Sequence, residues 1–198
     1  MSTVPTTIYA ARIFHNDNPT RLENRVGAWA LAVADRIVAS AIEVVDSDAV
    51  GAALISLAIY DGSTIERLRH IVGLSHPGAV RLVDRLESEG LVVRGPAEDS
   101  RAVALHLTRS GRDTAKRVLA ARERTLEQVL TPLSARERAQ LAKLIDRLLA
   151  ALPANRQELE VVCRLCDYRA CDGNRRGVCP VDIAVVGFEA LPAAHRAK

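Results

Sequence analysis

The chain has 198 residues, of which 48% are hydrophobic and 3% aromatic. This length allows one sizeable core and leaves residues for extensions or for a dimer interface. The formal net charge of +3 does not by itself indicate a nucleic-acid partner, so the distribution of the 27 Lys and Arg residues must decide. A composition dominated by Ala, Leu, Val and Arg excludes a disordered or all-β chain and favours helices.

Neither a secretion signal nor a membrane span is expected. The first residues lack a basic head followed by an apolar run, and the later apolar segment VGAWALAVADRIVASAIEVV is interrupted by Asp35, Arg36 and Glu43. We therefore expect a soluble protein of the cytoplasm with no membrane partner. Residues 1–19 show no hydrophobic period and end in the breaker cluster HNDNP, which indicates a loosely attached arm.

Helical spacing of apolar residues begins at Arg21 and predicts an amphipathic helix to about Val45. The sequence DSD at 46–48 stops it and offers caps for a second helix through Tyr60. That second helix is apolar on most sides, so it should be central.

Residues 63–90 have the pattern of a helix-turn-helix. Ser63 and Glu66 are spaced as a capping box before a short helix, and Gly73 supplies the turn. Ser75 then caps a further helix that ends at Gly90.

After Gly90 the period changes to two, and residues 91–108 predict a hairpin. The strands LVVR and RAVALHLT flank the turn GPAEDS, with Val103, Leu105 and Leu107 sharing one face. Such a hairpin directly after a helix-turn-helix is a wing. Two long helices follow over 110–152, separated at Pro132, and Ser134 and Glu137 are spaced as a capping box for the second. These helices need a partner surface, for which a second copy of the chain is the natural source.

The segments LSHPGAVRLVDRLESEGLVVR and EDSRAVALHLTRSGR resemble the recognition helix, wing and following helix of the MarR family of bacterial transcriptional regulators. The resemblance covers about residues 20–152. Two short patterns of the family, Asp-x-Arg in the wing and Leu-Thr-x-x-Gly-Arg after it, are matched by Asp99, Arg101, Leu107, Thr108, Gly111 and Arg112. The resemblance implies a mainly α fold with a small β-hairpin wing, a winged helix-turn-helix and a helical dimerisation region.

What the resemblance implies about function is sequence-specific DNA binding without catalysis. The chain would regulate transcription, as a repressor, by binding a pseudo-palindromic operator on double-stranded DNA as a homodimer. The DNA contacts would come from the start of the recognition helix and from the wing: Ser75, His76, Pro77, Gly78, Arg81, Arg85, Arg94, Asp99 and Arg101.

Among these residues, Arg81 and Arg101 are the best candidates for DNA contacts. Arg81 is the best candidate for a guanine, because a guanidinium can bind O6 and N7 together. Arg101 would enter the minor groove, oriented by Asp99, while Arg85 would lie on a phosphate and Arg94 near the backbone. Many relatives also bind a small phenolic or aromatic effector, but no residue here identifies one.

The tail, residues 153–198, contains every cysteine of the chain: Cys163, Cys166, Cys171 and Cys179. Cys163 and Cys166 form a C-x-x-C knuckle, in which two thiolates can bind one metal ion. Nearby basic residues would favour the thiolate form and offset its charge: Arg164, Arg169, Arg175 and Arg176.

Four sulfur ligands suit tetrahedral zinc and equally suit an iron–sulfur cluster. Redox-active disulfides and inert thiols are the other interpretations, and a metal could be structural or sensory. In an alternative function, the cysteine cluster is the primary functional site of a redox or metal-cluster module or of a zinc enzyme. Against the enzyme, no H-x-E precedes the cysteines, and four Cys ligands would close the zinc to water.

Overall fold

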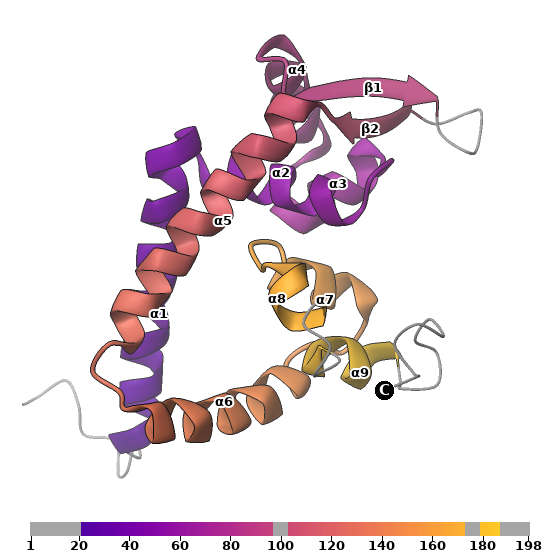
Figure 1. Cartoon of the computed structure of the whole chain (residues 1–198). Helices are drawn as coiled ribbons and strands as arrows, with labels where there is room; N and C mark the ends of the chain where they lie inside the picture. The colour runs from indigo at the N-terminus through magenta and orange to yellow at the C-terminus, as the bar shows by residue number, and fades with distance from the viewer. Residues whose placement is uncertain (1–20, 97–102, 173–178, 187–198) are drawn as a thin grey trace, which may run out of the picture. The chain divides into compact units, whose positions relative to one another are not determined.

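The computed structural model describes residues 21–96, 103–172 and 179–186 (Figure 1). The predicted arm, 1–19, lies outside them. Within the described residues, a mainly helical chain with one small hairpin is confirmed, and no helix is long and apolar enough to cross a membrane. The elements in chain order are α1 (Arg21–Val45), α2 (Asp48–Ile59), α3 (Ile65–Val72), α4 (His76–Ser88), β1 (Val92–Pro96), β2 (Val103–Leu107), α5 (Arg109–Leu130), α6 (Ala135–Ala150), α7 (Arg156–Val162), α8 (Tyr168–Asp172) and α9 (Pro180–Val186).

The chain forms two compact units that divide between Asp35 and Arg36, inside α1. The part of α1 in the first unit exposes large apolar side chains: Leu22, Val26, Trp29 and Leu31. The second unit begins with the end of α1, where Ala41 packs against Ile55 of α2 and Val118 of α5. All remaining elements belong to this second unit.

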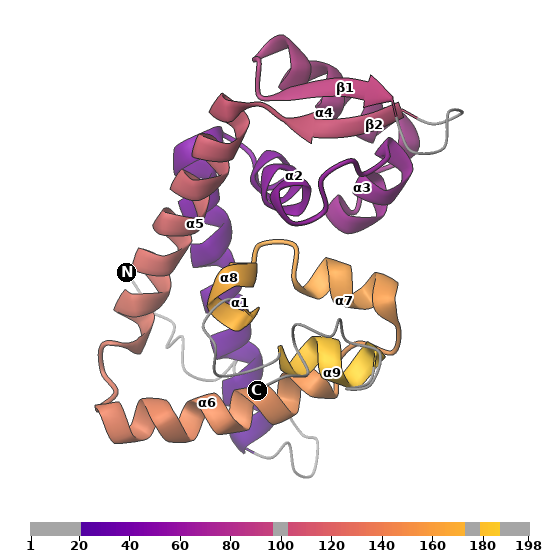
Figure 2. The same cartoon turned by 45° about the vertical axis from the view of Figure 1, so that its right-hand side comes forward.

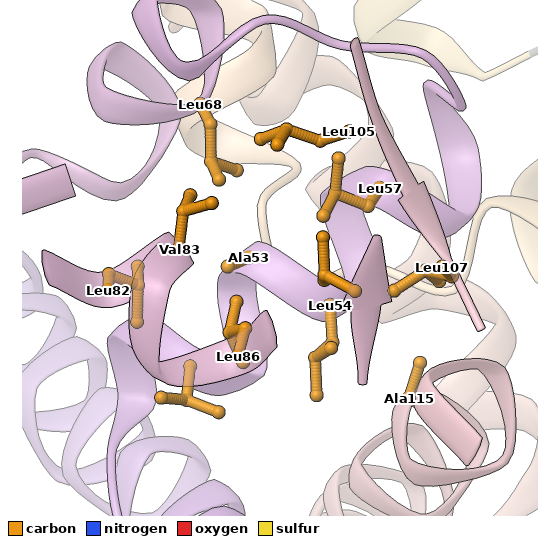
Figure 3. Close-up of a cluster of buried hydrophobic side chains, with 12 residues drawn as sticks. Ala53, Leu54, Leu57, Leu68, Leu82, Val83, Leu86, Leu105, Leu107 and Ala115 are labelled. Atoms are coloured by element: carbon orange, nitrogen blue, oxygen red, sulfur yellow. The ribbon is translucent and has the colours of Figure 1, made fainter. Parts of the chain in front are cut away.

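Helix α2 lies at the centre of the core, as its nearly continuous apolar sequence predicted. Leu54 and Leu57 are at most 1% exposed, and each fully buried leucine contributes about 1.5–3 kcal/mol. Figure 3 shows the side chains around them, which come from α3, α4, the hairpin and α5: Leu68, Leu82, Val83, Leu86, Leu105, Leu107 and Ala115. One core therefore fixes the two helices of the helix-turn-helix against the wing.

The cap of α3 differs from the sequence prediction. Thr64, not Ser63, is the N-cap, and its side chain accepts a hydrogen bond from the Arg67 amide at 3.2 Å. Ser63 is buried and donates to the Tyr60 carbonyl at 2.6 Å, while its backbone bridges to Leu105. The capping box of Ser63 and Glu66 was therefore wrong, because the chain still pairs with β2 at Ser63 and turns helical only one residue later.

The wing also differs from the simple alternation expected. β1 and β2 pair antiparallel, with Val92 opposite Leu107 and Pro96 opposite Val103. Leu105 and Leu107 are buried as predicted, but Val103 is 47% exposed and Ala104 is buried. At Val103 the hairpin has already passed beyond the core, so the apolar face is lost there.

The junction of wing and α5 explains the Leu-Thr-x-x-Gly-Arg pattern physically. The Thr108 side chain accepts a hydrogen bond from the Gly111 amide at 3.0 Å and donates to the Gly90 carbonyl at 2.6 Å. A Cβ on Gly111 would lie 2.0 Å from the Leu91 carbonyl oxygen, so only glycine fits. Arg112 closes the junction by donating to the Leu107 carbonyl at 2.7 Å.

After the predicted long helices, the tail is more ordered than the sequence indicated. α6 begins with the expected capping box of Ser134 and Glu137, but regular structure resumes after Pro153 in α7, α8 and α9. Leu159, Cys179 and Val181 are buried together and pack against Leu149 of α6. Figure 2 shows α9 beside α6, and α7 also contacts α3, so the tail joins the end of α6 to the helix-turn-helix.

Candidate nucleic-acid interface and thiol cluster

The two helices of the helix-turn-helix are joined by a turn that requires glycine. Gly73 adopts a left-handed conformation with φ 70°, and the Leu74 amide bonds to the Arg69 carbonyl at 2.9 Å. Ser75 then caps α4 by accepting a hydrogen bond from the Gly78 amide at 3.3 Å. This geometry places the start of α4 at the surface.

The residues predicted to approach the bases lie together on this surface. Ser75, His76 and Pro77 are exposed and Gly78 is half-buried. Arg81 follows one turn later, is exposed, and forms no ion pair or side-chain hydrogen bond within the described residues. Its guanidinium is therefore available to a ligand.

A carboxylate borders the start of α4. Glu66 of α3 binds Arg69 through two hydrogen bonds of 2.6 and 2.7 Å, which lower the pKa of Glu66 to about 2 and keep it ionised. His76 Nδ1 lies 3.6 Å from a Glu66 oxygen. This contact lies at the first residue of α4.

Arg85 and Arg94 are bound to carboxylates, unlike Arg81. Arg85 contacts Asp46 and Glu89, each at 2.7 Å, and the hydrogen bond to Asp46 is the larger cause of its raised pKa. Arg94 of β1 contacts Asp84 at 2.6 Å and also binds Glu87. Exposed pairs of this kind add little stability, but they orient the wing and the end of α1 relative to α4. A phosphate would have to compete with these carboxylates.

Two predicted wing contacts, Asp99 and Arg101, lie outside the described residues. The described wing ends at Pro96 and Val103, which are paired across the hairpin.

The four cysteines converge on one small cavity, although they span 17 residues of sequence. The cavity has a volume of about 20 Å³, and all four residues line it. Cys163 lies within hydrogen-bonding reach of Cys166 and Cys179, and Cys171 within reach of Cys179. None of the four forms a disulfide, and Cys179 is buried whereas Cys171 is exposed.

One sulfur of this cluster favours the thiolate. The hydrogen bond from Cys163 lowers the pKa of Cys166 to about 7, and the charges of Arg122 and Arg164 act in the same direction against burial. The pKa values of Cys163 and Cys171 are raised, chiefly by their hydrogen bonds to neighbouring thiols. Among the described residues, no group of three or more His, Cys, Asp or Glu side chains is positioned to hold a metal ion.

Arg122 of α5 also acts on the thiols, and no sequence pattern indicated it. Its Nε atom is buried and has no hydrogen-bond partner among the described residues. No local pattern could have found it, because it precedes the cluster by 41 residues and only tertiary packing brings it there. Of the basic residues expected near the sulfurs, Arg164 acts on Cys166, while Arg175 and Arg176 lie outside the described residues.

A bidentate ion pair connects the tail to the helix-turn-helix. Arg67 of α3 donates to Glu160 of α7 at 2.6 and 3.3 Å, and the Glu160 side chain is only 11% exposed. The Arg67 guanidinium also lies 4.0 Å from the centre of the Tyr60 ring. α7 is thus attached to both α3 and the end of α2.

A larger cavity of about 540 Å³ lies between α2, α5 and residues 166–169. Its walls are mostly apolar, with Arg112, Lys116 and Tyr168 among the polar groups. The size suits a small organic molecule.

Solved regulators share this arrangement of helices and wing. Wild-type MarR from Escherichia coli, in its apo form, is 22% identical and superimposes with a TM-score of 0.57, covering 69% of this chain and all of MarR. The chain has the winged-helix fold of MarR. A point mutant of MepR from Staphylococcus aureus, bound to an oligodeoxyribonucleotide, is 19% identical with a TM-score of 0.51 and covers 68% of this chain and all of MepR.

Among curated proteins, the transcriptional repressor MprA of Escherichia coli K12 is 31% identical over 109 residues, which are 54% of this chain. The chain spans 62% of the length of MprA. No family model matches the sequence. About three-tenths of this chain has no counterpart in MarR.

Proposed function

We propose that this chain is a transcriptional regulator of the MarR type that binds specific DNA sequences and has no catalytic role. The similarity to MprA, a transcriptional repressor, supports repression, and the MepR complex shows a related fold bound to DNA. The observation that carries the proposal is the exposed start of α4, where Arg81 is unpaired within the described chain. Such a regulator would act in the cytoplasm.

In this proposal α4 enters the major groove and the wing reaches the neighbouring minor groove. Arg81 reads a guanine, while Ser75, His76, Pro77 and Gly78 approach the adjacent bases and phosphates. Arg101, with Asp99, enters the minor groove. Arg85 and Arg94 chiefly orient α4 and the wing, because carboxylates already bind both guanidiniums.

The operator is pseudo-palindromic because the chain works as a homodimer. α6 has no buried residue, and Leu144 and Leu148 of α6, together with Leu152 just after it, are 54–64% exposed. The first part of α1 exposes Leu22, Val26 and Trp29 in the same way. Monomers rarely leave so much apolar helix surface uncovered, and a second copy is the occupant that a symmetric operator requires.

Fluorescence anisotropy on a duplex selected from random sequence tests this function. Affinity should fall steeply with salt, since phosphate contacts release counterions. Arg81→Ala should lose about 1–3 kcal/mol of binding and relax the preference at one base pair. Arg136→Ala, at an exposed arginine of α6, is the matched control and should bind as wild type. Equal affinity of the wild-type chain for selected and scrambled duplexes would refute sequence-specific binding.

For the tail we propose a zinc site on Cys163, Cys166, Cys171 and Cys179. Four thiols around one cavity match the ligand set that closes a tetrahedral zinc. The charge of Arg122, whose buried Nε has no hydrogen-bond partner within the described chain, offsets the net negative charge of a four-thiolate centre. The thiols must rearrange to bind the ion, because at present they form hydrogen bonds with one another.

Metal analysis of protein purified without oxygen tests the zinc proposal. Colourless protein with one zinc per chain is the expected result. Brown protein that contains iron and sulfide would instead indicate an iron–sulfur cluster. Absence of both metals would leave the disulfide or inert-thiol interpretations.

A small-molecule effector would occupy the 540 Å³ cavity between α2, α5 and residues 166–169. Its walls are mostly apolar and carry both cations, such as Arg112 and Lys116, and carboxylates, such as Asp61 and Glu123, which suits an amphipathic compound. Thermal-shift screening of acidic, basic and neutral amphipathic compounds, with wild type and Lys116→Ala compared, tests this. An equal response of both proteins would exclude a role for Lys116.

A further inference from the structure

We propose that a single thiophilic divalent ion in the thiol cavity fastens the tail to the helix-turn-helix, so that its occupancy sets DNA affinity. The proposal rests on the DNA-binding function and on the four-thiol site. It adds that the centre is a single ion and that binding of this ion affects DNA binding through contacts from the cysteines, along α7, to α3.

The position of the cavity is the first argument. Its walls come from two parts of the fold: Ser56, Ile59 and Tyr60 at the end of α2, and Leu159, Glu160 and the four cysteines in the tail. A group bound there touches the tail and the DNA-binding core at once. An ion that gathers the four sulfurs therefore fixes the tail beside α2.

The size of the cavity is the second argument, and it separates one ion from a cluster. A volume of about 20 Å³ is close to the space needed for one water molecule, roughly 10–15 Å³. Four irons with four sulfides would require the tail to move away from α2. One zinc-sized ion matches this volume.

The connection from the cysteines to α3 is the third argument. Cys163 is the C-cap of α7, and Glu160 lies one turn earlier on the same helix. Glu160 is nearly buried and binds both Arg67 donors, and the Arg67 amide is in turn held by Thr64, the N-cap of α3. Ordering Cys163 therefore orders the side chain that anchors the start of α3.

Helix α3 transmits this order to the DNA-binding surface. Leu68 is fully buried and packs in the same core as Leu82, Val83 and Leu86 of α4. A core of this density does not deform locally without moving its neighbours. We therefore expect the loaded chain to present α4 in a fixed position and the unloaded chain to bind DNA more weakly.

The test uses full-length, reduced, metal-free protein titrated with zinc chloride. Two measurements are made, hydrogen exchange of the α3 amides and anisotropy of a selected duplex. We expect one zinc per chain, slower exchange over residues 65–72, and a DNA affinity raised about fivefold or more, the usual range of coupling between sites. Zinc binding that leaves both the exchange and the affinity unchanged would overturn the proposal, and so would an iron–sulfur cluster in place of the ion.

Arg67→Gln separates the connection from the metal site, since Arg67 is not part of the cavity wall and all four cysteines stay in place. It should bind zinc as wild type does, but zinc should change α3 exchange and DNA affinity much less. Glu158→Gln is the control on α7, because a glutamine Oε1 can still accept the hydrogen bond that the Ala154 amide donates to Glu158. A full zinc response in Arg67→Gln would refute the route through Arg67.

The same data separate failure of this inference from failure of the DNA-binding function. If no duplex is bound with or without zinc, DNA binding is refuted, and the α3 exchange alone decides whether the ion fastens the tail. If a duplex is bound equally well in both states, the function stands and the coupling is refuted. Thermal unfolding of each variant confirms that it folds.

Discussion

Replacement of Gly111 with alanine should destabilise the fold at the base of the wing. The added Cβ would lie 2.0 Å from the Leu91 carbonyl oxygen and 3.1 Å from a Leu107 methyl group. The Leu91 oxygen is not a free neighbour, because it accepts a hydrogen bond from the Thr108 amide at 3.0 Å. The backbone must therefore separate at the point where β1 meets α5.

Three effects set the magnitude of this change. Loss of the hydrogen bond from the Thr108 amide costs about 1 kcal/mol. Forced overpacking adds about 1–3 kcal/mol. The better helix propensity of alanine returns up to about 1 kcal/mol. The net expectation is that Gly111→Ala lowers the free energy of unfolding by about 1–4 kcal/mol, which is a large part of the stability of a typical domain.

Urea unfolding followed by circular dichroism measures the effect. Ser110→Ala is the matched control, because Ser110 is exposed on the adjacent position of α5 and should change stability by less than about 0.5 kcal/mol. Equal stability of Gly111→Ala and wild type would refute the close approach of α5 to Leu91.

Three further substitutions test other parts of the fold. Leu54→Ala opens the centre of the core at a fully buried position and should cost about 2–5 kcal/mol in urea unfolding; a cost below about 1 kcal/mol would contradict the central place of α2. Ser134→Ala removes the capping box of α6 and should cost about 1 kcal/mol in thermal unfolding, whereas no change would show that the cap is dispensable. Leu148→Glu, at an exposed position of α6, should weaken dimerisation in sedimentation analysis, with Lys143→Glu as the control. An unchanged dimer in Leu148→Glu would contradict an interface on this face.

The sequence was sufficient to predict the elements whose signals are local. The helical period from Arg21 to Val45, the turn at Gly73 and the capping box at Ser134 each depend on neighbouring residues, and each is observed. The prediction of a cap at Ser63 was wrong, and the exposure of Val103 could not be predicted, because tertiary contacts decide both. Ser63 pairs with β2, and Val103 lies past the edge of the core.

The candidate site divides in the same way. The exposure of the α4 start followed from its cap and its period, and Arg81 is exposed as a DNA contact requires. The carboxylate partners of Arg85 and Arg94 were not predictable, because Asp46 is 39 residues away from Arg85 and Arg94 reaches back from the wing to α4. The cysteine spacing indicated a cluster, but its position against α2 and its link to α3 depend on packing of the tail.

Selection of duplexes from a random pool by the full chain, followed by sequencing and by the stoichiometry of the bound complex, tests DNA recognition most directly. We predict enrichment of one pseudo-palindromic sequence, bound by two chains, with weaker enrichment by Arg81→Ala than by wild type. A pool that stays random after repeated selection, or whose enriched sequence is bound equally well by Arg81→Ala, would contradict recognition through the start of α4.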